Sequence, residues 1–234
     1  MPLGLTLLVV ATILVLFGVG QRMLDRMRLS DKTAVLFMVA IFIGSLIPDI
    51  PLGRDLFINI GGAVVPLILV IYLFVKAGTG MEKARAAIAA ILSGLGVYLA
   101  GRYMPSEPET IIIDPNYAYG IIAGVIGYLF GRSRRASFIA GVLGVILADL
   151  AQAIENILLG IPTRIRLGGA GAVDTVVIAG FLAVILAEVV GELRERIQGG
   201  TAKKSMVYQQ GEFMRRERSE NKYEGGDDEN EQGS

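Results

Sequence analysis

Long apolar stretches separated by short polar connections dominate the first 190 residues of the chain. A helix that crosses the hydrocarbon core of a membrane needs about 20 predominantly apolar residues, and each stretch approaches or exceeds that length. The pattern therefore predicts an all-α fold, a polytopic membrane helix bundle with about seven transmembrane helices. The predicted spans cover residues 3–20, 33–48, 57–76, 86–101, 117–131, 136–159 and 167–190.

The basic residues are divided unequally between the two ends of these predicted spans. The connections after the first, third and fifth spans, together with the region after the seventh, hold 18 of the 22 Lys and Arg residues. The remaining four are Arg54, Arg102, Arg164 and Arg166. Because strongly basic connections stay in the cytoplasm, the N-terminus is expected outside and the C-terminus inside. The predicted location is the cell (plasma) membrane, as a multi-pass protein with the lipid bilayer as its partner.

The composition of the chain changes at about residue 199. From there the sequence is polar and Gly-rich, and residues 220–234 contain six acidic side chains with Lys222 as their one basic neighbour. Such segments cannot bury enough apolar surface to fold alone. The sequence therefore predicts two parts, a transmembrane helical domain of residues 1–198 and a disordered charged cytoplasmic tail of residues 199–234. Nothing in the tail indicates a partner.

The amino-acid composition excludes several kinds of chemistry. Charged residues make up 19% of the chain, below the roughly 25% of a soluble domain. With no Cys and no His, the chain has no thiolate nucleophile, no imidazole ligand for zinc or haem and no Ser-His pair. Basic and acidic residues balance at 22 each, so net charge does not favour a nucleic acid as partner. We expect no cofactor and no metal, and the composition leans against an enzyme.

Glycines recur at helical spacing in the fifth predicted span. Gly120, Gly124, Gly127 and Gly131 follow one another at intervals of three or four residues. Such positions lie along one face of a helix, and small residues there let a second backbone approach closely. The spacing predicts that this face packs against neighbouring helices.

A few polar side chains within or directly beside the predicted spans fall at similar depth. Counting about 1.5 Å per residue from the cytoplasmic ends, Asp49 lies ~24 Å, Asn59 ~26 Å, Asp149 ~20 Å and Asp174 ~24 Å along their helices. They would form one layer in the outer half of the membrane. Gln152 and Asn156 extend it on the same face of the sixth span, whereas Glu155 falls off that face. The candidate ion- or substrate-binding residues are Asp49, Asn59, Asp149, Gln152 and Asp174.

Asp149 is the most informative of these residues. No basic residue lies within its own predicted helix, and ten residues separate it from the outer connection. A charge at that depth costs at least a few kcal/mol, so the carboxyl group must be protonated, paired across helices or wetted by a cavity. The alternative for the whole layer is structural, with the acidic residues capping helix ends and the outer arginines neutralising them.

Two glycine runs adjoin the predicted layer. Gly61-Gly62 follows Asn59, and the run from Gly168 to Gly171 precedes Asp174. Either run is consistent with an irregular or re-entrant start to a helix, which is tolerated at membrane depth where it lines a cavity. The alternative is that these glycines simply allow tight turns and close packing.

A faint internal repeat accompanies these runs. The segment from Phe37 to Asp49 precedes Ile60-Gly61-Gly62-Ala63, and the segment from Phe138 to Asp149 precedes Leu167-Gly168-Gly169-Ala170. Both would turn on the outer side, so a true repeat would relate them by an axis along the membrane normal. Insertions are needed to align the two segments, and a fortuitous similarity is the alternative.

The chain also resembles a known family. The segments that carry the resemblance are Gly20-Gln21-Arg22, Leu46-Ile47-Pro48-Asp49-Ile50-Pro51, Ile58-Asn59-Ile60-Gly61-Gly62-Ala63, Gly131-Arg132-Ser133-Arg134-Arg135 and Gly168-Gly169-Ala170-Gly171. Over about residues 3 to 200 they are similar to the bacterial and archaeal membrane family catalogued as domain of unknown function 1614. The resemblance implies an uncharacterised multi-pass protein of prokaryotic origin, and it carries no catalytic residues across.

A second comparison concerns intramembrane aspartyl proteases of the presenilin type, which place one Asp on each of two neighbouring helices. Asp149 and Asp174 fit that outline, because a close carboxylate pair can share a proton. The family's motifs are otherwise missing: Val173 replaces the Gly before the second Asp, Ala148 replaces the Tyr before the first, and Pro-Ala-Leu is absent.

Three functions are consistent with the sequence. The first is a proton- or cation-coupled carrier that uses the acidic layer, with a proton or small cation as partner. The alternative is a non-catalytic membrane scaffold or assembly component, in which the layer is structural. An intramembrane aspartyl protease that uses Asp149 and Asp174 is the least favoured.

Overall fold

A computed structural model describes residues 3–17, 24–25, 27–53, 56–103, 114–161, 163–168, 172–197, 206–209 and 212–215. The chain divides into two compact units, Met1–Val189 and Val190–Ser234. In the second unit, β4 (Met206–Gln209) and β5 (Glu212–Arg215) pair as an antiparallel hairpin. The division of the chain at residue 198 and the disorder of the tail stay predictions.

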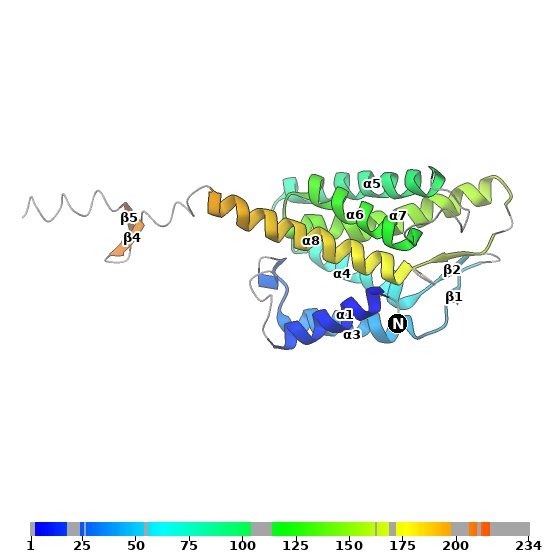
Figure 1. Cartoon of the computed structure of the whole chain (residues 1–234), viewed down its shortest axis with the longest axis horizontal. Helices are drawn as coiled ribbons and strands as arrows, with labels where there is room; N and C mark the ends of the chain where they lie inside the picture. Colours follow the sequence, from blue (N-terminus) through cyan, green and yellow to red (C-terminus); the bar gives the residue numbers. More distant parts are fainter. Residues whose placement is uncertain are drawn as a thin grey trace, which may run out of the picture. The chain divides into compact units, whose positions relative to one another are not determined.

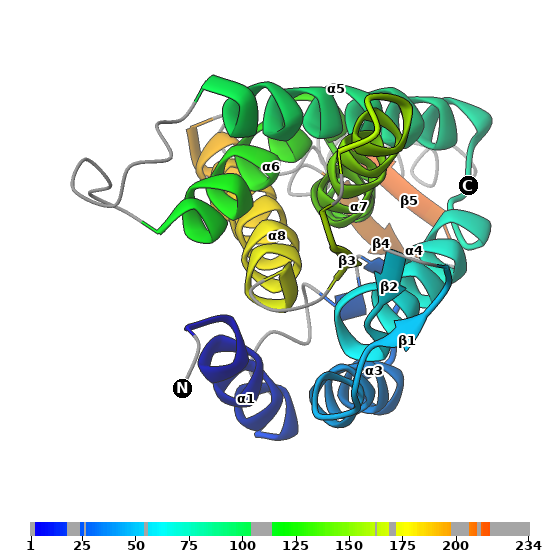
Figure 2. The same ribbon diagram turned by 90° about the vertical axis from the view of Figure 1, so that its right-hand side faces the viewer.

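The first unit is a bundle of helices that run side by side (Figure 1). Seen end-on, α5, α6 and α7 lie together on one side, α8 lies centrally, and α1 and α3 lie on the other side (Figure 2). The helices are α1 (Leu3–Leu16), α3 (Asp31–Ser45), the π-helix η1 (Ile60–Val64) continued by α4 (Val65–Val75), α5 (Gly80–Tyr103), α6 (Pro115–Gly131), α7 (Arg134–Leu158) and α8 (Ala172–Ile197).

Local sequence signals explain where several of these helices begin. The hydroxyl of Ser30 accepts a hydrogen bond from the Thr33 amide at the start of α3, and Ser133 accepts from the Ala136 amide at the start of α7. Asp114 caps α6 and is followed by Pro115. Side-chain oxygens at this position satisfy amide groups that the first helical turn leaves unpaired, and proline is tolerated just after them.

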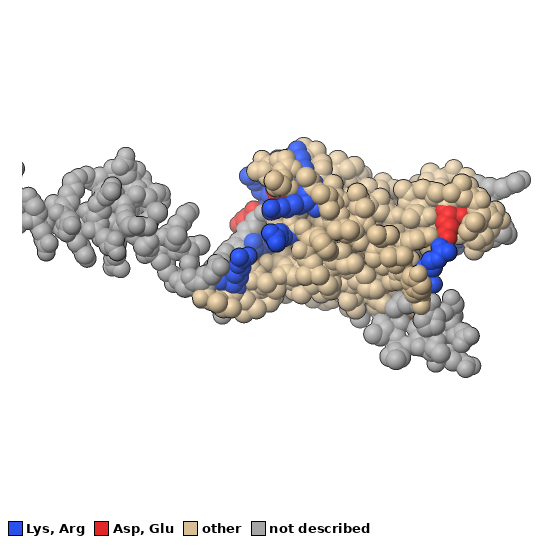
Figure 3. Space-filling model, turned by 90° about the horizontal axis from the view of Figure 1, so that it is seen from above, with Lys and Arg blue, Asp and Glu red and all other residues tan. Residues whose placement is uncertain are grey.

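Among the described residues, three helices are long and apolar enough to cross a membrane: Gly80–Tyr103, Arg134–Leu158 and Thr175–Arg194. Two shorter apolar helices cover Gly4–Leu16 and Ile60–Val75. Lys, Arg, Asp and Glu gather at the two ends of the first unit, and a broad uncharged surface separates them (Figure 3). Large exposed apolar side chains from several helices contribute to the surface of the first unit, among them Val10, Leu36, Ile71, Ile91 and Ile185. Apolar surface of this extent is unusual for a soluble monomer and fits a membrane protein.

The predicted glycine face of α6 is confirmed. Gly120, Gly124, Gly127 and Gly131 are all buried. A Cβ atom at Gly120 or Gly124 would press on α8, and one at Gly127 or Gly131 would press on the backbone near the start of α7. The small residues therefore let α6 approach two neighbouring helices at van der Waals distance, which provides helix association where lipid supplies no hydrophobic drive.

The sequence pattern missed a three-stranded sheet at one end of the bundle. β1 (Ile50–Pro51) pairs antiparallel with β2 (Leu56–Ile58), which pairs in parallel with β3 (Ile165–Leu167). Strands of two or three residues are too short to leave an alternating pattern in the sequence. The parallel pairing of β2 with β3 is the arrangement expected of a parallel internal repeat, which stays a prediction.

The sheet changes the predicted positions of two candidate residues. α3 ends at Ser45, so Asp49 lies in the connection before β1 rather than inside a span. The reason is Pro48, which disfavours helical backbone in the residue before it. Asn59 is the N-cap of η1, and its side-chain oxygen accepts from the Gly62 amide at 2.9 Å. The irregular start predicted at Gly61-Gly62 is therefore present as a π-helical turn.

Gly61 and Gly168 bring separate segments into close contact at this end of the bundle. A Cβ at Gly61 would overlap the backbone of Ile41 and Ser45 in α3. Gly168 has φ +65, and a Cβ there would overlap the backbone of Gly62. Only glycine accommodates both the left-handed backbone and this approach. Residues 169–171 of the second glycine run lie outside the described residues.

Candidate functional site

A cavity lies between α5, α6 and α7, near the end of the bundle where α5 ends and α6 begins. We call it the Asp149 cavity. Its volume is about 390 Å³. It is lined by Val97, Tyr98, Gly101, Arg102, Tyr119, Ala148, Asp149, Gln152, Glu155, Asn156 and Ile161. Most of its polar lining comes from α7, because this helix continues to Leu158 and presents one polar residue about every turn.

Asp149 lies on the wall of this cavity and is partly buried. Its Oδ2 accepts a hydrogen bond from the Gly168 amide nitrogen at a distance of 3.4 Å. In the described part of the chain, Asp149 forms no salt bridge. The backbone amide stabilises the carboxylate through its dipole but does not cancel its charge. A carboxylate without a counter-charge in an apolar bundle is costly, so Asp149 needs the water of the cavity, a proton or a cation.

The second carboxylate of the cavity has a different environment. Glu155 accepts hydrogen bonds from the Tyr98 hydroxyl at 2.5 Å and from Arg102 Nη1 at 2.6 Å. Arg102 Nη1 also donates to the Tyr98 hydroxyl at 3.2 Å. The three side chains link α5 to α7. Within this group, the guanidinium of Arg102 compensates the negative charge of Glu155. The cavity therefore contains one compensated and one uncompensated carboxylate.

The sequence interpretation placed Glu155 off the helical face of Asp149, and it did not foresee that the side chain of Glu155 lines the same cavity. On an ideal helix Glu155 points about 120° away from Asp149, as the spacing of six residues requires. Its longer side chain nevertheless reaches Arg102 and Tyr98 on α5. The pairing partners come from another helix, so no pattern within the span indicates them. The opposite charges at Arg102 and Glu155 were the available signal.

Gln152 and Asn156 also line the cavity, as their spacing from Asp149 predicts. Gln152 is exposed and Asn156 is half-buried. The lining thus supplies carboxylate, amide and hydroxyl oxygens, which are the ligands that hard cations prefer. Among the described residues no group of three or more acidic side chains is placed to hold a metal ion.

Asp49 and Asn59 line a different depression, which we call the loop cleft. Its volume is about 540 Å³. Asn59 is 5% exposed and its Nδ2 donates to Asp49 Oδ1 at 2.9 Å. Arg166 Nε lies 3.5 Å from Asp49 Oδ2. The loop cleft is lined by Ser45, Leu46, Ile47, Pro48, Asp49, Phe57, Asn59, Arg164 and Arg166.

The predicted layer is therefore divided between two sites. Asp149 and Gln152 share the Asp149 cavity, whereas Asp49 and Asn59 share the loop cleft. The segment from Arg166 to Gly168 joins them, because Arg166 contacts Asp49 and Gly168 contacts Asp149. The backbone of Asp174 lies in the first turn of α8, but its side chain lies outside the described residues, and so does Arg54.

These observations define a predominantly helical protein with apolar helices that are long enough to cross a membrane and with polar cavities at one end of the bundle. The chain belongs to the family described as "Protein of unknown function (DUF1614)", whose model matches residues 9–186. The matched region includes both the Asp149 cavity and the loop cleft. No curated protein and no solved structure matches the chain.

Proposed function

We propose that this chain is a multi-pass protein of the cell membrane that carries a proton or a small monovalent cation, with Asp149 as the binding carboxylate. The observation that carries the proposal is the contrast between the two acidic side chains of the Asp149 cavity. The charge of Glu155 is compensated by Arg102, and Tyr98 adds a hydrogen bond, whereas Asp149 meets only the neutral amide of Gly168 among the described residues. A reversible site needs the second kind of carboxylate, because a permanent counter-charge would compete with the ion.

The proposed topology has about seven membrane spans, with the N-terminus outside and the tail inside. The division of the basic residues supports it, and so does the separation of charged side chains to the two ends of the first unit (Figure 3). In this orientation the Asp149 cavity lies in the outer half of the membrane. The Arg102–Glu155 pair then lies between Asp149 and the outer surface, since Arg102 is near the end of α5.

The remaining lining supports an ion that keeps part of its hydration. A cavity of about 390 Å³ holds several water molecules beside a bound cation. Gln152 and Asn156 offer amide oxygens on the cavity lining, and Tyr119 offers a hydroxyl group. Weak, partly hydrated binding at several oxygen atoms is what a carrier requires, because the ion must leave as readily as it enters.

Flux measurements in sealed vesicles test this proposal directly. The purified full-length chain is reconstituted into liposomes, and uptake of Na⁺, K⁺ and protons is followed after a concentration gradient is imposed. The proposal predicts uptake of at least one of these ions above that of protein-free liposomes. Absence of uptake for all three ions, in vesicles that contain folded protein, would favour the scaffold function instead.

A further inference from the structure

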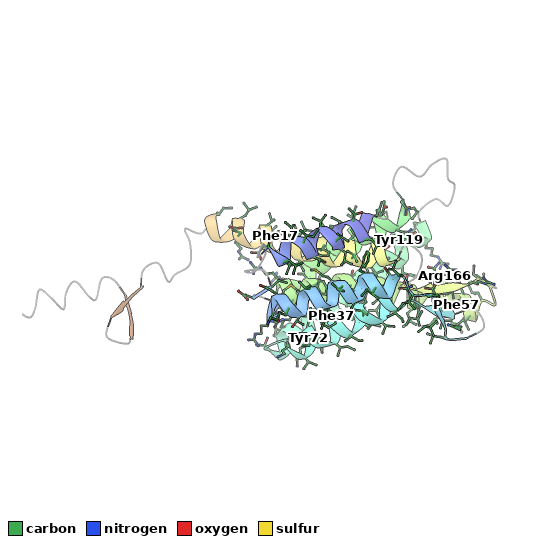
Figure 4. The ribbon with its side chains drawn as sticks, turned by 90° about the horizontal axis from the view of Figure 1, so that it is seen from below. Phe17, Phe37, Phe57, Tyr72, Tyr119 and Arg166 are labelled. Atoms are coloured by element: carbon green, nitrogen blue, oxygen red, sulfur yellow. The ribbon has the colours of Figure 1, made fainter. Side chains whose placement is uncertain are left out.

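The loop cleft contains two arginines that the proposed ion site does not use. Arg166 lies in β3, Arg164 immediately precedes this strand, and both side chains line the loop cleft. Phe57 is the register partner of Arg166 on β2, so these two side chains share one face of the sheet. Phe57 and Arg166 lie near each other at the sheet end of the bundle (Figure 4). Two guanidinium groups and one aromatic ring therefore converge on one wall.

On the opposite wall, the carboxylate of Asp49 lies beside Arg166. Asp49 accepts from Asn59 Nδ2 on one carboxylate oxygen and lies 3.5 Å from Arg166 Nε on the other. Asn59 is itself buried and is held by its bond to the Gly62 amide. Asp49 thus engages the Nε edge of Arg166 and leaves its two terminal nitrogens available. A guanidinium held in this way presents a planar pair of donors to a ligand.

Arg164 has no such partner. It is exposed on the cleft, and in the described part of the chain it makes no hydrogen bond and no ion pair. With Arg164, Arg166 and Asp49 all ionised, these three groups carry one net positive charge. The cleft therefore attracts an anion, and Asp49 serves to position Arg166 rather than to bind a cation.

We propose that the loop cleft binds the phosphate group of an organic phosphate between Arg164 and Arg166. Paired guanidinium groups recognise phosphate through parallel charge-assisted hydrogen bonds. The volume of about 540 Å³ is in the range of small-molecule sites and far exceeds one phosphate group. The organic substituent then packs against Phe57 and against Leu46 and Ile47 on the opposite wall.

The phosphate can belong to a soluble phosphoester or to a lipid headgroup, and both present the same chemistry to the cleft. Phe57 and Arg166 of the cleft lie at the sheet end of the bundle, where either source can reach them (Figure 4). This inference is independent of the proposed ion site, because it uses none of the residues that line the Asp149 cavity.

Calorimetric titration of the full-length chain in an uncharged detergent tests the inference. The probes are glycerol phosphate, a short-chain phosphatidic acid and, as the phosphate-free control, the corresponding diacylglycerol. We expect at least one phosphate probe to bind and the diacylglycerol not to bind. R164Q should weaken that binding about tenfold, as the loss of a charged hydrogen-bond partner requires. R85Q removes an exposed arginine near the start of α5, outside the cleft, and this variant should bind the probe as the wild type does.

Binding of glycerol phosphate would show that the cleft takes a soluble phosphoester. Binding of phosphatidic acid alone would show that it takes the phosphate group of a lipid. The inference is overturned if neither phosphate probe binds, or if R164Q and R85Q weaken binding equally. R164Q should keep the melting temperature of the wild type, since Arg164 lacks a partner among the described side chains. Should it melt earlier, R164K replaces it, and this variant must also bind more weakly because an ammonium group cannot form the bidentate pair.

Discussion

The amide nitrogen of Gly168 lies 3.4 Å from Oδ2 of Asp149, which ties an acidic side chain within α7 to the segment that leads into α8. The same glycine packs on the backbone of Gly62 at the start of η1. Gly168, which has a left-handed backbone, thus connects the wall of the Asp149 cavity to the start of η1. The stability of this contact and the accessibility of the cavity can be tested separately.

The contact at Gly168 predicts a difference between two glycines of equal backbone conformation. Gly160 and Gly168 both have φ +65, but a Cβ at Gly160 meets nothing within 4 Å, whereas one at Gly168 overlaps Gly62. Gly160→Ala should cost about 1 kcal/mol, the cost of a left-handed alanine. Gly168→Ala should cost several times as much, because the backbones must separate. Melting temperatures of the two variants in the same detergent provide the comparison, and equal shifts would contradict the contact.

The accessibility of the cavity can be measured with cysteines, because the chain contains none. Gln152 lines the Asp149 cavity, whereas Ile154, two residues further along α7, is 51% exposed on the apolar surface. In intact membranes, Gln152→Cys should react with a charged, water-soluble thiol reagent and Ile154→Cys should not. Equal reaction at both positions would mean that this part of α7 is not surrounded by lipid. Protection of both would mean that water does not reach the cavity.

The Arg102–Glu155 pair predicts a restricted mouth for that cavity. Arg102→Gln removes the charged donor that links α5 to Glu155, so α5 and α7 should separate more readily at this end. We expect Gln152→Cys to react roughly two- to fivefold faster when combined with Arg102→Gln, the modest effect of a partly exposed ion pair. Arg85→Gln, at the other end of α5, is the matched control and should leave the rate unchanged. An unchanged rate with Arg102→Gln would remove this pair from the entrance.

The orientation of the chain is a further prediction. A reporter that is active only in the cytoplasm, fused after residue 200, should be active, because 18 of the 22 basic residues fall on the side assigned to the cytoplasm. An exported reporter at the same point should be inactive. The opposite pair of results would reverse the proposed topology.

The helices were predictable from the sequence because their apolar lengths and caps are local. The predicted span 117–131 matches α6, and its glycine face packs as expected. Elements that depend on distant partners could not be predicted. β2 and β3 are three residues each and form a sheet only because two far-apart connections meet at one end of the bundle. Apolar length alone also carried the predicted span 33–48 to Pro48, three residues beyond Ser45, where α3 ends.

The candidate site shows the same limit. Asp149 and Gln152 were placed on one face by their spacing, and both line one cavity. The depth of a residue along its span, however, could not show that Asp149 and Asp49 line different cavities. That depends on which helices pack together. Glu155 was missed because its partners lie on α5. Charges on different helices can pair across a bundle without any signal in either helix alone.

The Asp149→Asn substitution should keep the fold while removing the ion response. Asn retains the size of the side chain and an oxygen that can accept from Gly168, but it cannot bind a proton or cation as a carboxylate does. Asp114→Asn is the matched control. It removes another carboxylate from the same end of the bundle, where Asn caps a helix about as well as Asp.

The most direct test of the central claim is the melting temperature of wild type, Asp149→Asn and Asp114→Asn across series of Na⁺, K⁺ and pH. A cation at 100 times its dissociation constant stabilises the folded state by about 2.7 kcal/mol, which corresponds to about 5 to 10 °C in a chain of this size. We predict such a response to at least one series in wild type and Asp114→Asn, and its loss in Asp149→Asn. Coincident responses in Asp149→Asn and Asp114→Asn would contradict the assignment of Asp149 as the ion-binding carboxylate.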